Sequence, residues 1–176
     1  VKNVLPAAKA VASLFLAIFS IGIAIGSIAI NRLLGGHVSA KYAPASVIGM
    51  GACIVAFHLV CSFWTPAPDG QLLSLGEFLS HPMAGWLSAS LLGVSTFGGM
   101  FVVPLYAFIT TTVEKCEAAR TVAANNIVNS GAMVAGSLMA LGLSVAGMPV
   151  IQQLLLVAAM TIPCAWLAWK LHCACD

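Results

Sequence analysis

The sequence predicts an all-α polytopic membrane protein, and two observations carry that prediction. Hydrophobic residues make up 61% of the chain and charged residues only 7%, whereas a soluble domain carries about 25% charged residues. So few charges cannot cover a surface exposed to water. The chain also contains five uncharged runs, each near or above the roughly 20 residues that cross a bilayer as a helix. None of them alternates in polarity as the strands of a membrane barrel do.

The runs predict spans at residues 10–30, 43–64, 83–112, 122–145 and 150–169 within a single membrane-transport domain that covers residues 1–176. The third run is longer than a bilayer requires, and it contains Gly98, Gly99 and Pro104. We therefore expect this helix to tilt, to kink near those residues or to extend past the membrane. Pro163 predicts a bend in the last span.

Small residues recur at four-residue spacing in two of the spans. Gly22 and Gly26 share one helix face, as do Ala132, Gly136 and Ala140. In lipid, such positions let two helix backbones approach closely, so we expect tight helix packing at both places. Tryptophans near the ends of the runs predict an interfacial aromatic belt, formed by Trp64, Trp86, Trp166 and Trp169.

The connectors between the runs predict the orientation, because basic residues prefer the cytoplasmic side of a membrane. One orientation places five basic residues inside, Arg32, Lys41, Lys115, Arg120 and Lys170, and two outside, Lys2 and Lys9. The opposite orientation reverses that ratio. We expect a cytoplasmic C-terminus and N-terminal residues on the outer face. Five spans that begin outside without a signal peptide also predict a missing upstream span, so the chain is expected to be a fragment.

Signatures of catalysis are missing from the sequence. It contains no GxSxG, no HExxH and no phosphate-binding loop, and no charged residue occupies the middle of a run. His172, Cys173 and Cys175 lack the second ligand pair of a zinc site. The net charge of +2 is small and scattered, which argues against nucleic acid as a partner. We expect neither an enzyme, nor a metal site, nor a cofactor.

The polar side chains that remain are concentrated where the fourth run begins. Asn125 and Asn129 share one helix face, and Asn126 and Ser130 share the next. These groups can bond neighbouring helices or contact a ligand, and the two interpretations are equally open. Arg120, five residues earlier, can bind a phosphate or carboxylate as a fork, or it can reach toward the lipid headgroups.

The first connector, GSIAINRLLGGHVSAKYAP at residues 26–44, resembles the conserved cytoplasmic loop of the major facilitator superfamily, whose pattern is Gly-x-x-x-Asp-Arg-x-Gly-Arg-Arg. Ser27 stands at the first glycine, Asn31 replaces the aspartate and Arg32 matches. Leu34, Gly35 and Gly36 replace the final Gly-Arg-Arg. In the family this loop helps to latch helices in one access state, and the lost charges suggest the copy in the second half of such a transporter.

Longer blocks resemble the bacterial lysophospholipid transporters of that superfamily, some of which are fused to an acyltransferase and an acyl-carrier-protein ligase. They are FSIGIAIGS at residues 19–27, GGMFVVPLYAFI at 98–109 and AARTVAANNIVN at 118–129. The resemblance implies helices 8 to 12 of a twelve-helix fold, a partial C-terminal half. If the chain binds such a substrate, the candidate contacts are Asn125, Asn126, Asn129, Arg120 and Tyr106.

By this resemblance, the protein moves lysophospholipid across the bacterial inner membrane by alternating access, for phospholipid remodelling. The expected partners are lysophospholipid or another amphipathic small molecule, membrane lipid, the missing N-terminal half and a cytoplasmic or fused acyltransferase. Two alternatives stay open. One is an exporter of drugs or small metabolites, and the other is the membrane portion of a fused phospholipid acyltransferase.

Overall fold

The computed structural model describes residues 9–35, 37, 39–64, 74–114 and 116–175, and every regular element in those ranges is a helix. The helices are α1 (Lys9–Leu33), α2 (Ala43–Ser62), α3 (Leu75–Ser80), α4 (Ala84–Thr112), α5 (Ala118–Val145) and α6 (Val150–Cys175). All except α3 are long and apolar enough to cross a membrane. This confirms that the chain is all-helical in these ranges and has five apolar helices of membrane-spanning length.

Helix ends differ from the predicted runs where a charged residue ends the run but not the helix. α5 begins at Ala118, four residues before the expected start of the span at residue 122, and so it includes Arg120. α6 continues past Trp169 through Lys170 to Cys175. Lysine and arginine are good helix formers, so a charge limits the span but does not stop the helix.

The first two helices are joined by a turn that depends on a glycine. Gly35 has φ +58°, a left-handed conformation that a glycine adopts without steric cost, and its N–H donates to the carbonyl of Arg32 at 3.2 Å. Pro44 lies in the first turn of α2, where its missing N–H is not needed. Gly36 of the predicted conformational loop lies outside the described residues.

The short helix α3 begins with a capping box. The Ser74 N–H donates to Oε2 of Glu77 at 2.7 Å, and the Glu77 N–H donates to the Ser74 hydroxyl at 3.3 Å. Two donors that a helix leaves unsatisfied at its start are bonded reciprocally. The same hydrogen bond from the Ser74 backbone lowers the pKa of the Glu77 carboxyl below its usual value.

A Schellman turn ends α5 and leads into α6. The Met148 N–H donates to the carbonyl of Leu143 at 2.9 Å, and the Gly147 N–H donates to that of Ser144 at 3.1 Å. Gly147 has φ +88°, as the motif requires. Gln153 of α6 then donates to the Ser144 hydroxyl at 2.9 Å, so the two helices are hydrogen-bonded at this hairpin.

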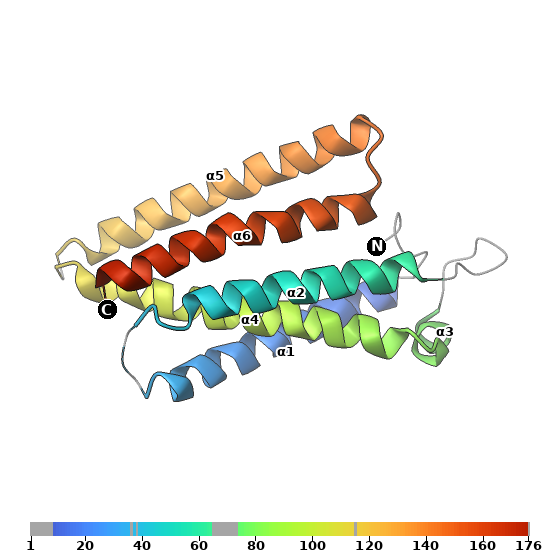
Figure 1. Cartoon of the computed structure of the whole chain (residues 1–176), viewed down its shortest axis with the longest axis horizontal. Coiled ribbons are helices and arrows are strands. Elements are labelled where there is room, and N and C mark those ends of the chain that lie inside the picture. Colours follow the sequence, from blue (N-terminus) through green and yellow to red (C-terminus); the bar gives the residue numbers. More distant parts are fainter. Residues whose placement is uncertain (1–8, 36, 38, 65–73, 115, 176) are drawn as a thin grey trace.

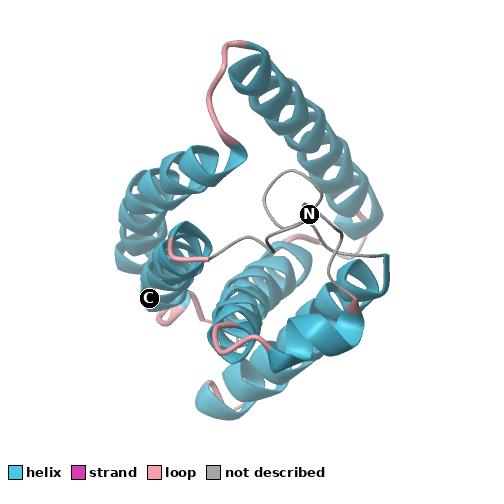
Figure 2. Ribbon diagram, turned by 90° about the vertical axis from the view of Figure 1, so that its right-hand side faces the viewer, coloured by secondary structure: helices cyan, strands magenta, loops and turns pink. Residues whose placement is uncertain are grey.

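The long helices form an antiparallel bundle in which α4 is central (Figure 1). α1 and α2 both pack against α4, and α6 packs against α2. α5 stands apart along most of its length, as the end-on view in Figure 2 shows. The bundle therefore has a well-packed part, made of α1, α2, α4 and α6, and one loosely attached helix.

The largest buried cluster lies where α1 and α4 begin and α2 ends, and α3 covers it; its members are Val11, Cys61, Trp64, Phe78, Ala84 and Leu87. The Trp64 ring is stacked on His81 with centroids 4.0 Å apart and on Phe78 at 5.8 Å. Trp64 is only 8% exposed, so its predicted place in a lipid-facing belt is wrong. The Phe78 ring of α3 covers the Trp64 ring. Trp86, Trp166 and Trp169 are more than half exposed.

Glycines permit the close crossing of α1 and α4. Gly22, Gly26 and Gly99 are buried in this contact. A Cβ on Gly22 would overlap the side chain of Ser95, and one on Gly26 would overlap the backbone of Thr96. The prediction of tight packing at Gly22 and Gly26 is therefore confirmed.

The second predicted packing stripe is not packed. Within the described residues α5 buries none of its side chains, and Ala132, Gly136 and Ala140 are all exposed. A Cβ on Gly136 would meet no atom within 4 Å. The spacing of small residues permits a close helix contact, but the bundle of α1, α2, α4 and α6 does not reach this face.

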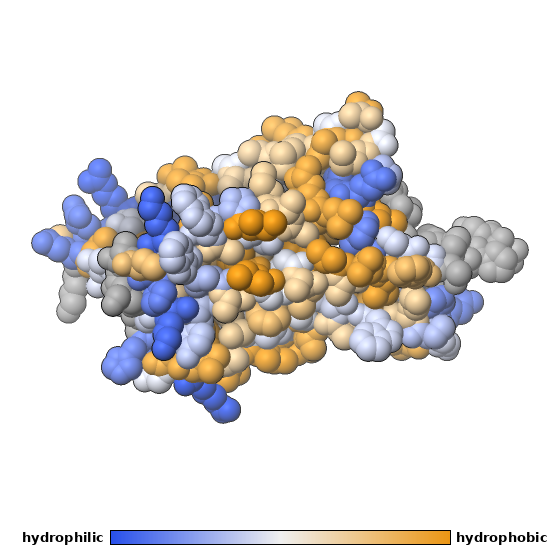
Figure 3. Space-filling view, in the orientation of Figure 1, coloured by the Kyte–Doolittle hydropathy of each residue, from blue (hydrophilic) through white to orange (hydrophobic). Residues whose placement is uncertain are grey.

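Most of the described basic residues lie at the end of the bundle on the left of Figure 1, where hydrophilic residues gather in Figure 3. There α1 and α6 end with Arg32 and Lys170, α5 begins with Arg120 nearby, and Lys41 lies just before α2. Lys9, at the start of α1, lies at the opposite end. The antiparallel helices thus separate the described basic residues into the two groups that the connectors predict.

Candidate functional site

A partly polar pocket of about 260 Å³ lies between α1 and α4 at the basic end of the bundle. Its lining residues are Ser27, Ile30, Asn31, Leu34, His37, Val103, Pro104 and Ala107. The pocket therefore brings together Ser27 and Asn31 of the predicted conformational loop and Pro104 of the predicted kink. Arg32 is exposed beside it and does not line it.

Two polar groups in this pocket are available for contact. The Ser27 hydroxyl is occupied, because it donates to the carbonyl of Ile23 at 2.7 Å. The amide of Asn31 and the imidazole of His37 are exposed, and no carboxylate lines the pocket. The pocket can therefore exchange hydrogen bonds with a neutral or zwitterionic group but offers no anion of its own.

Pro104 introduces a local gap in the hydrogen bonding of α4. It lies buried inside the helix, and without an N–H it cannot donate to the carbonyl of Met100. A missing bond of this kind is where long helices bend most easily. Pro163 does the same in α6, but its side chain is exposed. A bend at Pro104 would alter the α1–α4 pocket directly, and one at Pro163 would not.

The asparagines of α5 form the second polar feature. Asn126 and Asn129 are exposed and Asn125 is partly exposed. Within the described part of the chain, none of these three amides has a hydrogen-bond partner, and neither does Arg120. Tyr106 of α4 is 40% exposed, and no hydrogen bond between described residues joins it to α5. The structure thus groups Arg120 with the asparagines on one helix but leaves Tyr106 apart.

α5 has two faces of different character. Asn125, Asn129, Gly136 and Ala140 recur near the four-residue spacing of one face, which is polar at its start and lined by small residues further on. Bulky aliphatic side chains cover the opposite face, and each is more than 60% exposed: Ile127, Val134, Leu138, Leu141 and Val145. The aliphatic face suits lipid, whereas the amides need polar partners.

Two further features lie between α2 and α6. His58 donates from Nδ1 to the carbonyl of Ile151 at 2.8 Å and so bridges α2 and α6. An apolar groove of about 480 Å³ runs beside this contact between the same two helices. Hydropathy does not say which helices are neighbours, so neither feature follows from the runs. The small residues Gly51, Ala158 and Ala165 are the one signal in the sequence that points to this helix contact.

These features define the chain as a polytopic α-helical membrane protein with a partly polar pocket at its basic end and an unpartnered asparagine-bearing helix. Comparison of the chain with protein-family models, with curated proteins and with solved structures gave no match.

Proposed function

We propose that the chain belongs to a transporter of the major facilitator type that moves lysophospholipids across the bacterial inner membrane by alternating access. The observation that carries this proposal is the set of unpartnered amides on the exposed polar face of α5. An unsatisfied amide in hydrocarbon costs about 1–3 kcal/mol on mutational scales and more in a fully apolar medium. Such a face is stable only against polar protein groups, water or a polar ligand.

The loose packing of α5 against the other helices supports a transporter in which this helix moves. α1 and α4 are held together at buried glycines, whereas α5 has few contacts, with its neighbour α4 and with α6 at their hairpin. In alternating access, helical bundles rock against each other around a substrate site between them. A loosely attached helix with an amide-bearing face is suited to line that path, and the remaining half of the transporter is its proposed partner.

The chemistry of the polar groups supports the substrate class. The exposed groups are neutral amides, with one guanidinium at Arg120, and no acidic residue lies within the described parts of the five spans. A zwitterionic headgroup can bond amides and place its phosphate near a guanidinium. Its single acyl chain can lie on the apolar surfaces that surround these groups.

The orientation proposed for this transporter places the basic end of the bundle and the C-terminus in the cytoplasm. Arg32, Lys41, Arg120 and Lys170 at one end, against Lys9 at the other, support it. Substrate would then leave the transporter on the side where reacylation takes place, in a fused or separate acyltransferase.

The test uses the complete protein in cells that lack their own lysophospholipid uptake, with radiolabelled lysophosphatidylethanolamine as the probe. We expect uptake above the empty-vector level, strongly reduced in Asn125→Ala and Asn129→Ala and reduced in Arg120→Ala. Ser137→Ala is the matched control on the same helix, because that hydroxyl only bonds the carbonyl of Met133, at 2.8 Å. Uptake at the empty-vector level with normal membrane insertion would refute the substrate class.

The exporter alternative is separated in the same cells. Accumulation of lysophospholipid that is unchanged by the protein, together with reduced accumulation of a cationic dye, would indicate an exporter instead. Loss of activity in Asn125→Ala and Asn129→Ala, but not in Ser137→Ala, would then still assign the α5 face to the pathway.

A further inference from the structure

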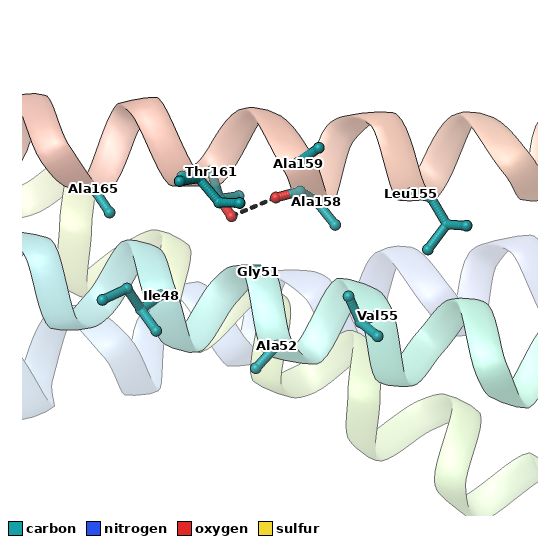
Figure 4. Close-up of a pocket in the computed structure, with 10 residues that line it drawn as sticks. Ile48, Gly51, Ala52, Val55, Leu155, Ala158, Ala159, Thr161 and Ala165 are labelled. Carbon is teal, nitrogen blue, oxygen red and sulfur yellow. Dashed lines mark hydrogen bonds between the residues drawn. The ribbon is translucent and has the colours of Figure 1, made fainter.

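The groove between α2 and α6 is apolar throughout its lining. Figure 4 shows Gly51, Ala158, Thr161 and Ala165 between the two helices. The other lining residues are Ile48, Ala52, Val55, Leu155, Ala159 and Ile162. Thr161 carries the one side-chain hydroxyl of the lining, and that hydroxyl donates to the carbonyl of Ala158 at 2.6 Å. An occupant of this groove therefore finds apolar contacts and no side-chain hydrogen bond.

The groove opens to the outside of the bundle. Ile162 is 72% exposed and Ile48 is 62% exposed, and they form part of its opposite walls. Its base is closed, because a Cβ on Gly51 would overlap the hydroxyl of Thr161. Since α2 and α6 both have the length and apolarity of membrane spans, we expect this opening to face lipid.

The groove lies along the middle of the α6 span, because it begins five residues after Val150 and ends five residues before Lys170. Ten residues separate Leu155 from Ala165, which is about 15 Å of helix. Half of the hydrocarbon core of a bilayer is also about 15 Å. An acyl chain that descends from the headgroups at the basic end would therefore reach the groove at Ala165 and occupy part of its length.

Basic residues lie beyond the groove at that headgroup level. Lys170 follows Ala165 by five residues, about 7.5 Å, and lies on nearly the same face of α6 as Ala159, three turns away. Its Nζ is 5.5 Å from the centroid of the Trp166 ring. Lys41 lies two residues before the start of α2, at the same end of the bundle, and its Nζ is 5.8 Å from the centroid of the Tyr42 ring.

Among the described residues at this end of the bundle, there are half as many acidic side chains as basic ones. The described carboxylates at this end of the bundle are Glu114 and Glu117, both in the connector between α4 and α5 and neither in the lining of the groove. A groove for one acyl chain thus leads to two lysines that attract a negative headgroup. Each lysine is expected to contribute to lipid affinity as a basic residue does near an anionic membrane surface.

From this arrangement we propose that the α2–α6 groove binds an anionic phospholipid, with one acyl chain along the groove and the phosphate between Lys41 and Lys170. This site is on the lipid-facing side of the bundle and is separate from the amide face of α5. It does not depend on the transport function proposed above, because only the groove and the lysines carry it.

The probe is phosphatidylglycerol with a photoactivatable diazirine in one acyl chain, added in small amount to phosphatidylcholine vesicles that contain the complete protein. After illumination, we expect crosslinks on peptides of α2 and α6, with few on the exposed aliphatic face of α5. Excess unlabelled phosphatidylglycerol should remove these crosslinks, and excess phosphatidylcholine should not.

Two sets of variants distinguish the contribution of the lipid headgroup from that of the acyl chain. Lys41→Gln and Lys170→Gln are each expected to reduce crosslinking several-fold, up to about fivefold if each lysine contributes as a basic residue at an anionic surface does. Lys9→Gln is the matched control at the opposite end of the bundle. Ala52→Leu and Ala159→Leu narrow the groove at exposed positions and should also reduce it, whereas Ala140→Leu on α5 should not.

Four outcomes would overturn the proposal. Equal labelling of α2, α5 and α6 would mean that lipid contacts the helices without a site. Equal competition by phosphatidylcholine, or full labelling in the double variant Lys41→Gln and Lys170→Gln, would show that the site does not select an anionic headgroup. Absence of lipid adducts on α2 and α6, with the protein dimeric in the same vesicles, would assign the groove to a second copy of the chain. Helical circular dichroism of each variant confirms that it is folded.

Discussion

Adjacent glycines in α4 offer a sharp test of the bundle, because alanine at one should disturb it and alanine at the other should not. A Cβ on Gly99 would lie 2.7 Å from the carbonyl oxygen of Ile23 and 3.3 Å from its Cα, both backbone atoms of α1. A Cβ on Gly98 would meet only the sulfur of Met50, at 4.0 Å. Ordinary contacts begin near 3.4 Å, so Gly99→Ala must push α1 and α4 apart by about 0.7 Å.

The magnitude follows from two opposing effects. Overpacking a tight contact costs about 1–3 kcal/mol. Alanine in place of glycine inside a helix contributes up to about 1 kcal/mol of stability in water, and this gain is common to both variants. We therefore expect Gly98→Ala to be neutral or slightly stabilising and Gly99→Ala to be destabilising. The difference of about 1–3 kcal/mol between them isolates the contact with Ile23.

Thermal unfolding in detergent, followed by the loss of helical circular dichroism, measures this difference. A change of 1 kcal/mol shifts the Tm of a chain of this size by about 2–4 °C, so Gly99→Ala should melt roughly 2–12 °C below Gly98→Ala. Gly136→Ala on α5, where the new Cβ meets nothing within 4 Å, checks the effect of helix propensity alone. Equal Tm values for Gly98→Ala and Gly99→Ala would refute the close crossing of α1 and α4.

Three further predictions concern other parts of the chain. His58→Phe removes the hydrogen bond to Ile151 and should lower the free energy of unfolding by about 0.6–1.7 kcal/mol in the same melting assay. Hydrogen bonds lower the pKa of Glu77 below the ordinary glutamate value of about 4.3. The capping box should therefore stabilise α3 fully when the pH is above that ordinary value, and this stabilisation should be lost as the pH falls through the lowered pKa. Amide hydrogen exchange of α3 measures the change. In intact cells, an impermeant maleimide should label the exposed Cys116 only after the membrane is opened, because its connector is expected in the cytoplasm.

Each of these has its own control. Ser62→Ala should melt close to the parent protein, since its hydroxyl mainly bonds the carbonyl of His58 in its own helix, at 2.9 Å; a drop as large as that of His58→Phe would contradict the bridge. Glu77→Gln keeps an acceptor but cannot titrate, so exchange from α3 that still accelerates at low pH would contradict the carboxylate's role. Labelling of Cys116 from outside intact cells would reverse the orientation.

The membrane spans were predictable because bilayer thickness imposes a length on every apolar run. Charge counting also placed Arg32, Lys41, Arg120 and Lys170 together, since antiparallel helices alternate in direction. α3 was missed although its signal was present: Ser74 and Glu77 have the spacing of a capping box. α3 has only six residues, too few to form an apolar run of membrane-spanning length.

Neighbour relations were not predictable. Gly22 and Gly136 have the same small-residue spacing, yet only Gly22 meets another helix. Hydropathy describes how each helix meets lipid, whereas the contacts of α2 with α6 depend on how the side chains of both fit together. The same holds for Trp64. Its position near a span end is typical of an interfacial aromatic belt, but α3 covers its ring.

The turn between α5 and α6 has a consequence for how the protein enters the membrane. Residues 146–149, which connect the two helices, are uncharged, and the Schellman turn bonds their backbone internally. Moving this connector through hydrocarbon therefore carries no charged side chain across, and charge is the dominant barrier to translocation. The two helices can insert together as one hairpin, in a single step of biogenesis. A lysine at Ala146 should slow that step while leaving the finished fold nearly unchanged, because Ala146 is exposed.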